Sequence, residues 1–110
     1  MTADIGAPLE VRTDPDTRRV ELAGELDMAT APQLIEGATP LVGSDGDITI
    51  GLAGVTFLDS SGIAALLDIG RALAGRGRVL LSRPRPNVRR VLQLTGLCGP
   101  DGGMAFVDDG

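Results

Sequence analysis

Apolar and polar positions alternate in two short stretches near the N-terminus. Residues 9–12 alternate once and residues 20–23 alternate again, with an acid- and proline-containing segment, 13–16, between them. Alternation with a period of two is typical of strands with one buried face, and Asp and Pro are typical of turns. The pattern therefore predicts a β-hairpin with Val20 and Leu22 on its buried face.

The apolar spacing then changes to that of a helix. Apolar residues recur at helical intervals at Leu34, Ile35, Ala38, Leu41 and Val42. Thr30, with Pro32 and Gln33 behind it, fits a capping box in which Thr30 is the N-cap and Gln33 reaches back to it. Pro40 lies inside the apolar pattern, so we expect it to end or kink the helix near residues 38–39.

Strands and helices alternate through the rest of the chain. The pattern predicts strands at 47–52, 78–81 and 104–107. It also predicts a helix that follows residues 59–60 and ends at 75–77, and a third helix that begins near Val88 and is stopped at 95–96. A hairpin followed by strand–helix alternation predicts an α/β fold with a mixed sheet that is partly parallel. Because the strands alternate cleanly, we expect helices mainly on one face of the sheet and light cover on the other.

Length and composition narrow the class of protein. The chain has 110 residues, enough for one domain, with 43% hydrophobic residues but only two Phe, no Trp and no Tyr. We expect a flexible N-terminal tail at residues 1–7 and one domain at 8–108. The net charge of −5 argues against nucleic acid as a partner, because phosphate backbones need a basic surface.

Missing residue types exclude several chemistries. The chain has no His and no Lys, which excludes a Ser-His-Asp triad and a P-loop lysine and leaves a poor ligand set for zinc. We therefore expect no metal, no cofactor and no enzymatic activity. The single cysteine, Cys98, suits a reducing compartment and is expected to be a small buried or half-buried residue. With no apolar run long enough for a signal peptide or a membrane span, we expect a cytoplasmic protein.

The sequence Asp59-Ser60-Ser61-Gly62 joins a predicted strand to a predicted helix. Such loops collect functional residues in open α/β sheets. If Asp59 or Ser60 caps the helix, Ser61 lies in the first turn with a free hydroxyl, and Gly62 leaves room for a partner. A helix N-terminus favours an anion by about 0.3–1 kcal/mol, so a phosphoryl group on Ser61 should be tolerated. Periodicity alone favours a simple helix cap.

A second turn has the same position between a strand and a helix. Asp27 and Thr30 lie there, and they would be close to Ser61 if the two strands are neighbours in the sheet. With Asp27 and Asp59 nearby, a phosphate carrying about −1.5 to −2 charges would change the local field strongly. A basic stretch elsewhere is expected to be a solvated face; it comprises Arg83, Arg85, Arg89 and Arg90.

Three stretches together resemble a known family. VELAGELDMATAPQL (20–34), ITIGLAGVTFLDSSGIAALL (48–67) and VRRVLQLTGLCG (88–99) are similar to the STAS domain of bacterial anti-sigma factor antagonists. The resemblance implies a STAS-like single domain with a mixed four- to five-stranded sheet. It also implies that Ser61 is the phosphorylation target, and Asp27 and Thr30 match the family's acid and hydroxyl residue.

The resemblance implies a partner-switching role. The unmodified antagonist would bind an anti-sigma factor that is also a serine kinase. Phosphorylation of Ser61 with ATP would release it, and a serine phosphatase would reset it. The expected docking surface comprises Asp27, Thr30, Asp59, Ser60 and Gly62, with Asp68 and Arg71 of the second helix extending it. The isolated chain is expected to be a monomer that does not bind membranes.

Other functions remain open. A STAS scaffold or adaptor in a regulatory or transport assembly would have the same fold with a serine that is never modified. A serine hydrolase using Ser61 lacks both the GxSxG motif and a His to activate the hydroxyl. Direct nucleotide binding between the two turns is a further alternative.

Overall fold

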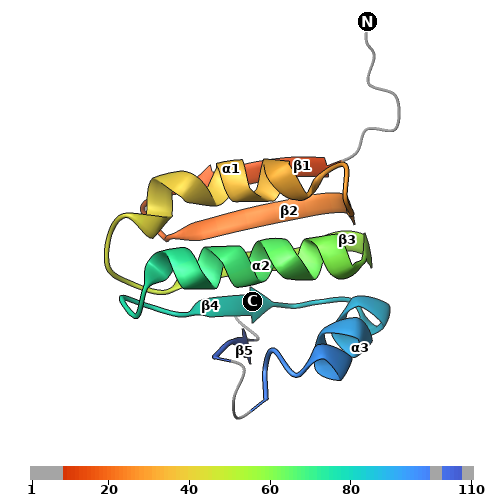
Figure 1. Ribbon diagram of the computed structural model, residues 1–110. Helices are drawn as coiled ribbons and strands as arrows, with labels where there is room; N and C mark the ends of the chain where they lie inside the picture. The colour runs from red at the N-terminus through yellow and green to blue at the C-terminus, as the bar shows by residue number, and fades with distance from the viewer. Residues whose placement is uncertain (1–8, 100–102, 108–110) are drawn as a thin grey trace, which may run out of the picture.

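The hairpin at the N-terminus forms as the alternation predicts. The computed structural model describes residues 9–99 and 103–107, so the expected tail at 1–7 lies outside the described residues (Figure 1). Strand β1 (Leu9–Asp14) pairs antiparallel with β2 (Arg19–Leu26), and Val11 lies opposite Leu22. The Asp14 carboxylate accepts a hydrogen bond from the Asp16 amide at 3.0 Å, which closes the turn.

The sheet is mixed and has five strands in the order β1-β2-β3-β4-β5. Strands β3 (Ile48–Leu58), β4 (Val79–Ser82) and β5 (Ala105–Val107) all run parallel to β2. This confirms the predicted fold class. Strand β3 continues beyond the alternating segment, with shifts of register against β2. Gly54 allows this close approach, since a Cβ there would lie 2.9 Å from the carbonyl oxygen of Leu22.

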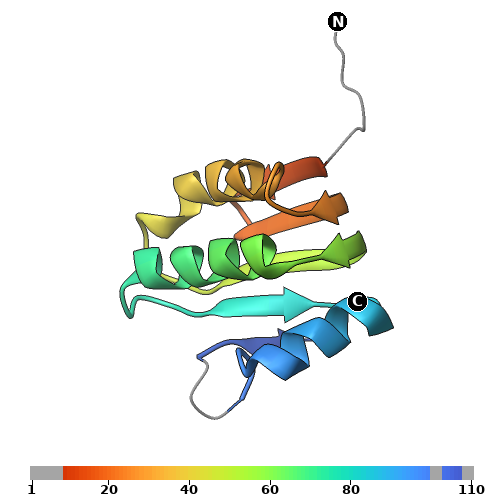
Figure 2. The same ribbon diagram turned by 45° about the vertical axis from the view of Figure 1, so that its right-hand side comes forward.

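Three helices lie on one face of the sheet (Figures 1 and 2). They are α1 (Ala31–Val42), α2 (Ser60–Leu73) and α3 (Pro86–Thr95). The core between the layers is aliphatic and includes Leu22, Ile50 and Leu81, all fully buried. Burying each such side chain stabilises the fold by about 1.5–3 kcal/mol. Within the described part of the chain, no helix is long and apolar enough to cross a membrane.

The opposite face of the sheet carries polar side chains, and no helix of the described residues covers it. Arg19 and Glu21 form an ion pair there, with 2.9 Å between Nε and Oε1. The Glu21 carboxylate lies over Gly51 of the neighbouring strand, where a Cβ would come within 2.1 Å of it. The expectation of one covered and one lightly covered face is therefore confirmed.

We expected Pro40 to end or kink helix α1 near residues 38–39, and this prediction is wrong. It continues through Pro40 to Val42. Because Pro40 lies in the last turn, its missing N–H removes only one intrahelical hydrogen bond. Arg18 also stabilises this end, since its Nη2 donates to the carbonyl oxygen of Leu41 at 2.9 Å. Arg76 donates similarly to the carbonyl oxygen of Val42.

Candidate functional site

The two turns that the sequence singles out lie side by side. Strands β2 and β3 are neighbours, and Leu26 pairs with Leu58 at their carboxyl ends. The amide of Asp59 donates to the carbonyl oxygen of Leu26 at 3.2 Å, which links the two turns directly. The adjacency expected for Asp27 and the serine loop is therefore present at this edge of the sheet.

Asp59 is the residue that caps α2. Its backbone is extended, with φ −120° and ψ −171°, and its carboxylate accepts hydrogen bonds from the amides of Ser61 at 2.9 Å and Gly62 at 3.3 Å. Ser60 is the first residue of the helix and is exposed. Since Asp59 takes both amides, neither serine hydroxyl is needed as a cap.

The hydroxyl of Ser61 is accessible and has no partner in the described part of the chain. Its residue is partly exposed, and the hydroxyl forms no hydrogen bond with any of the residues that the structure describes. Ser61 is therefore not packed beneath apolar atoms, and an enzyme could reach it.

We expected Gly62 to leave open space for a partner, and this prediction is wrong. It is buried, and a Cβ at this position would lie 2.6 Å from Cδ1 of Leu58 and 2.8 Å from Cγ of Leu26. The glycine instead allows the first turn of α2 to pack directly onto the ends of β2 and β3. This position therefore fixes the height of the serine loop above the sheet.

The capping box expected at Thr30 does not form. Thr30 has helical φ and ψ of −106° and −16°, and its side chain makes no cap hydrogen bond to α1. Its Oγ1 points back, donating to the carbonyl oxygen of Glu25 at 2.7 Å and accepting from the Asp27 amide at 2.9 Å. With 1% of its surface exposed, Thr30 supports the turn from beneath and cannot border a docking surface directly.

Asp27 organises the same turn. Its Oδ1 accepts hydrogen bonds from the amides of Ala29 at 3.0 Å and Thr30 at 3.1 Å. These bonds make a compact loop that leaves Met28 outside, with 78% of its surface exposed. Asp27 is half-buried. It therefore shapes the edge of the site and presents Met28.

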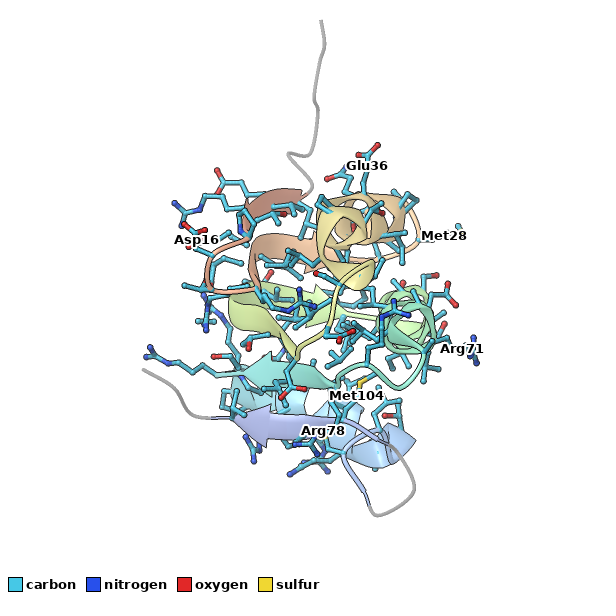
Figure 3. All side chains as sticks on the ribbon, turned by 90° about the vertical axis from the view of Figure 1, so that its left-hand side faces the viewer. Asp16, Met28, Glu36, Arg71, Arg78 and Met104 are labelled. Carbon is cyan, nitrogen blue, oxygen red and sulfur yellow. The ribbon has the colours of Figure 1, made fainter. Side chains whose placement is uncertain are left out.

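A groove of about 440 Å³ runs between α1 and α2 beside Ser61. One wall comes from the Asp27 turn and α1, and the other comes from α2. The lining residues are Met28, Ala31, Pro32, Ile35, Ser61, Ala64, Ala65 and Asp68. Figure 3 shows Met28 on the helix side of the sheet. The groove is mostly apolar, and the Ser61 hydroxyl is one of its few polar groups.

The groove contains only part of the expected docking surface, which stays a prediction. Asp68 lines the groove, whereas Asp27, Asp59 and Ser60 do not. Asp68 pairs with Arg71 at 3.2 Å, but both side chains are more than half exposed, so this pair contributes little to stability. The apolar lining was not predicted. Its signal in the sequence is Met28, a large apolar residue in a turn that has no core to face.

Cys98 is half-buried, as expected. Burial raises the pKa of its thiol, and the positive charge of Arg89 lowers it to a lesser extent. In the described ranges, no three Cys, Asp or Glu side chains are close enough together to hold a metal ion.

Known proteins share both the sequence pattern and the fold. Residues 9–105 match the family described as Mlab, STAS domain. An anti-sigma F factor antagonist of Lysinibacillus sphaericus is 36% identical over 88 residues, covering 77% of this chain and 74% of the relative. The anti-sigma-B factor antagonist of Bacillus subtilis is 29% identical over 90 residues, covering 81% of this chain and 83% of the relative.

Two solved structures are similar over most of their length. The structure of the anti-sigma factor antagonist SpoIIAA in its unphosphorylated form has a TM-score of 0.71 and 30% identity, covering 91% of this chain and 90% of that chain. An anti-sigma factor antagonist from Mycobacterium paratuberculosis has a TM-score of 0.77 and 25% identity, covering 94% of this chain and 90% of that chain. This chain therefore belongs to the STAS domain family, and its relatives there are anti-sigma factor antagonists.

Proposed function

We propose that the protein is an anti-sigma factor antagonist whose binding is gated by phosphorylation of Ser61. Unphosphorylated, it binds an anti-sigma factor that is also a serine kinase. Phosphorylation by that kinase in the cytoplasm releases it, and a serine phosphatase restores binding. The observation that carries this proposal is the Ser61 hydroxyl, which lines the α1–α2 groove and has no hydrogen-bond partner among the described residues.

The groove supplies the apolar part of the proposed docking surface. Met28 and Ile35 contribute large side chains, and Ala64 keeps the opposite wall low. An exposed side chain such as Met28 has little effect on the stability of the free protein. It contributes to binding free energy when a partner covers it. Asp59 and Asp27 hold the two turns that border the groove.

The position of Asp59 determines what a phosphate would do. Asp59 already accepts hydrogen bonds from the amides at the start of α2, so a phosphate on Ser61 does not find these donors free. About −1.5 to −2 charges would instead stand between Asp59 and Asp68. A partner would have to desolvate this charge, and any partner carboxylate near the groove would be repelled.

The test compares Ser61 variants with matched Ser60 variants against the cognate anti-sigma factor kinase, using calorimetry. Ser61→Ala should bind constitutively, and Ser61→Asp should bind about 10²–10³-fold more weakly, which corresponds to about 3–4 kcal/mol. Ser60→Asp should weaken binding far less, because Ser60 does not line the groove. Equal binding by Ser61→Asp and wild type would contradict the proposal.

Intact mass after incubation with the kinase and ATP separates gating from a scaffold role. Addition of one phosphate to wild type, with none added to Ser61→Ala, supports gating. No added phosphate on wild type supports the alternative, an adaptor of the same fold that phosphorylation does not switch.

A further inference from the structure

The charges are divided between two sides of the molecule. Residues 9–68 contain eleven acidic residues and three arginines, a net charge of −8, whereas residues 69–110 contain seven arginines and three acidic residues, a net charge of +4. All seven arginines lie within 69–99, and the three acidic residues are Asp101, Asp108 and Asp109. The first segment forms β1, β2, α1, β3 and most of α2, and the second forms the end of α2, β4, α3 and β5 (Figure 1). Because the strands follow chain order across the sheet, the acidic and basic segments lie at opposite ends of it.

The basic side contains a pocket of about 240 Å³ between α3 and β5. It is lined by Arg83, Pro84, Arg89, Phe106 and Val107. The guanidinium carbon of Arg89 lies 4.1 Å from the centre of the Phe106 ring. This cation–π contact holds the guanidinium in place over an apolar floor while its N–H groups stay available to a ligand.

Both arginines of this pocket lack a carboxylate partner within residues 9–99 and 103–107. Across the residues that the structure describes, neither Arg83 nor Arg89 donates a side-chain hydrogen bond or forms an ion pair. Arg18, by contrast, donates to several backbone carbonyls, and Arg85 donates to the carbonyl oxygen of Ala53. The pocket thus holds two guanidinium groups whose N–H groups are used by no hydrogen bond or ion pair within the described residues.

Arg83 has an unfavourable backbone conformation. Its φ is +53°, in the left-handed region, and it directly precedes Pro84. This region crowds the Cβ of any residue other than glycine, and a following proline restricts the backbone further. Glycine would fit here without that cost. Arg18 and Ala74 have similar φ values of +53° and +51°, so the strain at Arg83 supports a role for its side chain only together with the pocket that it lines.

We propose that the Arg83–Arg89 pocket is a docking site for a carboxylate-rich segment of a partner protein. An Asp or Glu carboxylate would accept charge-assisted hydrogen bonds from both guanidinium groups. Its methylene groups would pack against Phe106 and Val107. The pocket shares no residue with the α1–α2 groove, so this proposal does not depend on the phosphorylation of Ser61.

The charge division favours an acidic protein segment over nucleic acid. Duplex DNA carries one charge per about 1.7 Å and would extend beyond the basic side onto the acidic side. The net charge of −5 would also repel a long polyanion. A short acidic segment of a protein can instead bind the basic surface without extending onto the acidic side.

The chain's two phenylalanines provide an internal control for the test. Selective ring-¹³C labelling gives NMR signals from Phe106, in the pocket, and from Phe57, at the end of β3. Titration with a hexaglutamate peptide should shift the Phe106 signals to saturation and leave the Phe57 signals unchanged. The apparent affinity should fall with added salt, because exposed charges are screened beyond about 8 Å at 0.15 M ionic strength.

Substitutions distinguish binding of the peptide in the pocket from general electrostatic attraction of the peptide to the basic side. Arg83→Gln and Arg89→Gln should each weaken peptide binding about tenfold, the loss expected for one charge-assisted contact. Arg78→Gln removes the same charge from the same side but outside this pocket, and should change binding less than about twofold. Arg83→Gly should weaken binding as much as Arg83→Gln while raising Tm, since it relieves the backbone strain.

Three results would overturn the proposal. The first is an unchanged Phe106 signal at saturating peptide, and the second is an equal loss of binding in Arg78→Gln and Arg83→Gln. The third is a larger Phe106 shift with inorganic phosphate or an oligothymidine of equal charge than with the peptide, which would assign the pocket to phosphate.

Discussion

The buried hydroxyl of Thr30 holds the turn that presents Met28, and its removal should have a measurable cost. The Thr30 Oγ1 contacts the carbonyl oxygen of Glu25 at 2.7 Å and the Asp27 amide at 2.9 Å. Thr30→Val replaces this hydroxyl with a methyl group of similar size. Both backbone groups would then lack their side-chain partner.

The expected loss follows from these two contacts. A buried polar group without a partner costs about 1–3 kcal/mol. Because Glu25 is exposed and Asp27 is half-buried, water can reach part of the site, and we expect a total of about 2–3 kcal/mol. With about 2.1 cal/mol/K of unfolding entropy per residue, this corresponds to a fall in Tm of roughly 9–13 °C for a chain of this length.

Thermal and urea unfolding followed by far-UV circular dichroism would measure the effect, since the chain has no Trp or Tyr for fluorescence. Thr30→Ser is the matched control, because it keeps the hydroxyl and loses one methyl group, at a cost of about 1 kcal/mol. Thr30→Ser should therefore be more stable than Thr30→Val. The opposite order would show that the methyl group, and not the two hydrogen bonds, holds the turn.

Three further predictions concern stability and reactivity. Asp59→Ala removes the α2 cap and should cost about 1 kcal/mol in urea unfolding, whereas Asp59→Asn should cost much less; equal costs would contradict a capping role. Gly77→Ala places a Cβ 2.1 Å from the backbone oxygen of Gly46, so we expect a loss of about 3 kcal/mol, and an unchanged midpoint would argue against this close packing. Because burial raises the pKa of Cys98, iodoacetamide at pH 8 should alkylate it more slowly than free cysteine, and Arg89→Gln should slow the reaction further; a faster reaction in that variant would contradict the stated influence of Arg89.

Much of the fold can be predicted from periodicity because the packing agrees with local preference. Ile48, Ile50 and Leu52 alternate in the sequence and are all fully buried in β3. Gly96 adopts the left-handed conformation, with φ +76°, that ends α3 after Thr95. In these segments the same residue suits both the local backbone conformation and its place in the packed fold. The sequence pattern therefore predicts the structure correctly.

The errors arise where a tertiary contact decides the outcome. The sequence shows Pro40 as a helix breaker but does not show that Arg18, more than 20 residues earlier, reaches the last turn of α1. Thr30 matches a capping motif, yet its hydroxyl bonds to β2 and the Asp27 turn instead. Gly62 suggests open space until Leu26 and Leu58 are placed beneath it. Each case depends on a neighbour that spacing along the chain cannot identify.

The identical order of strands in the sheet and in the sequence has a consequence for biosynthesis. Every strand that leaves the ribosome pairs with the strand made just before it, so no edge of the sheet has to wait for a distant segment. By residue 58 the nascent chain already contains the hairpin, α1 and the third strand. We therefore expect this protein to assemble progressively as it leaves the ribosome, with the α1 side of the α1–α2 groove emerging before Ser61 does.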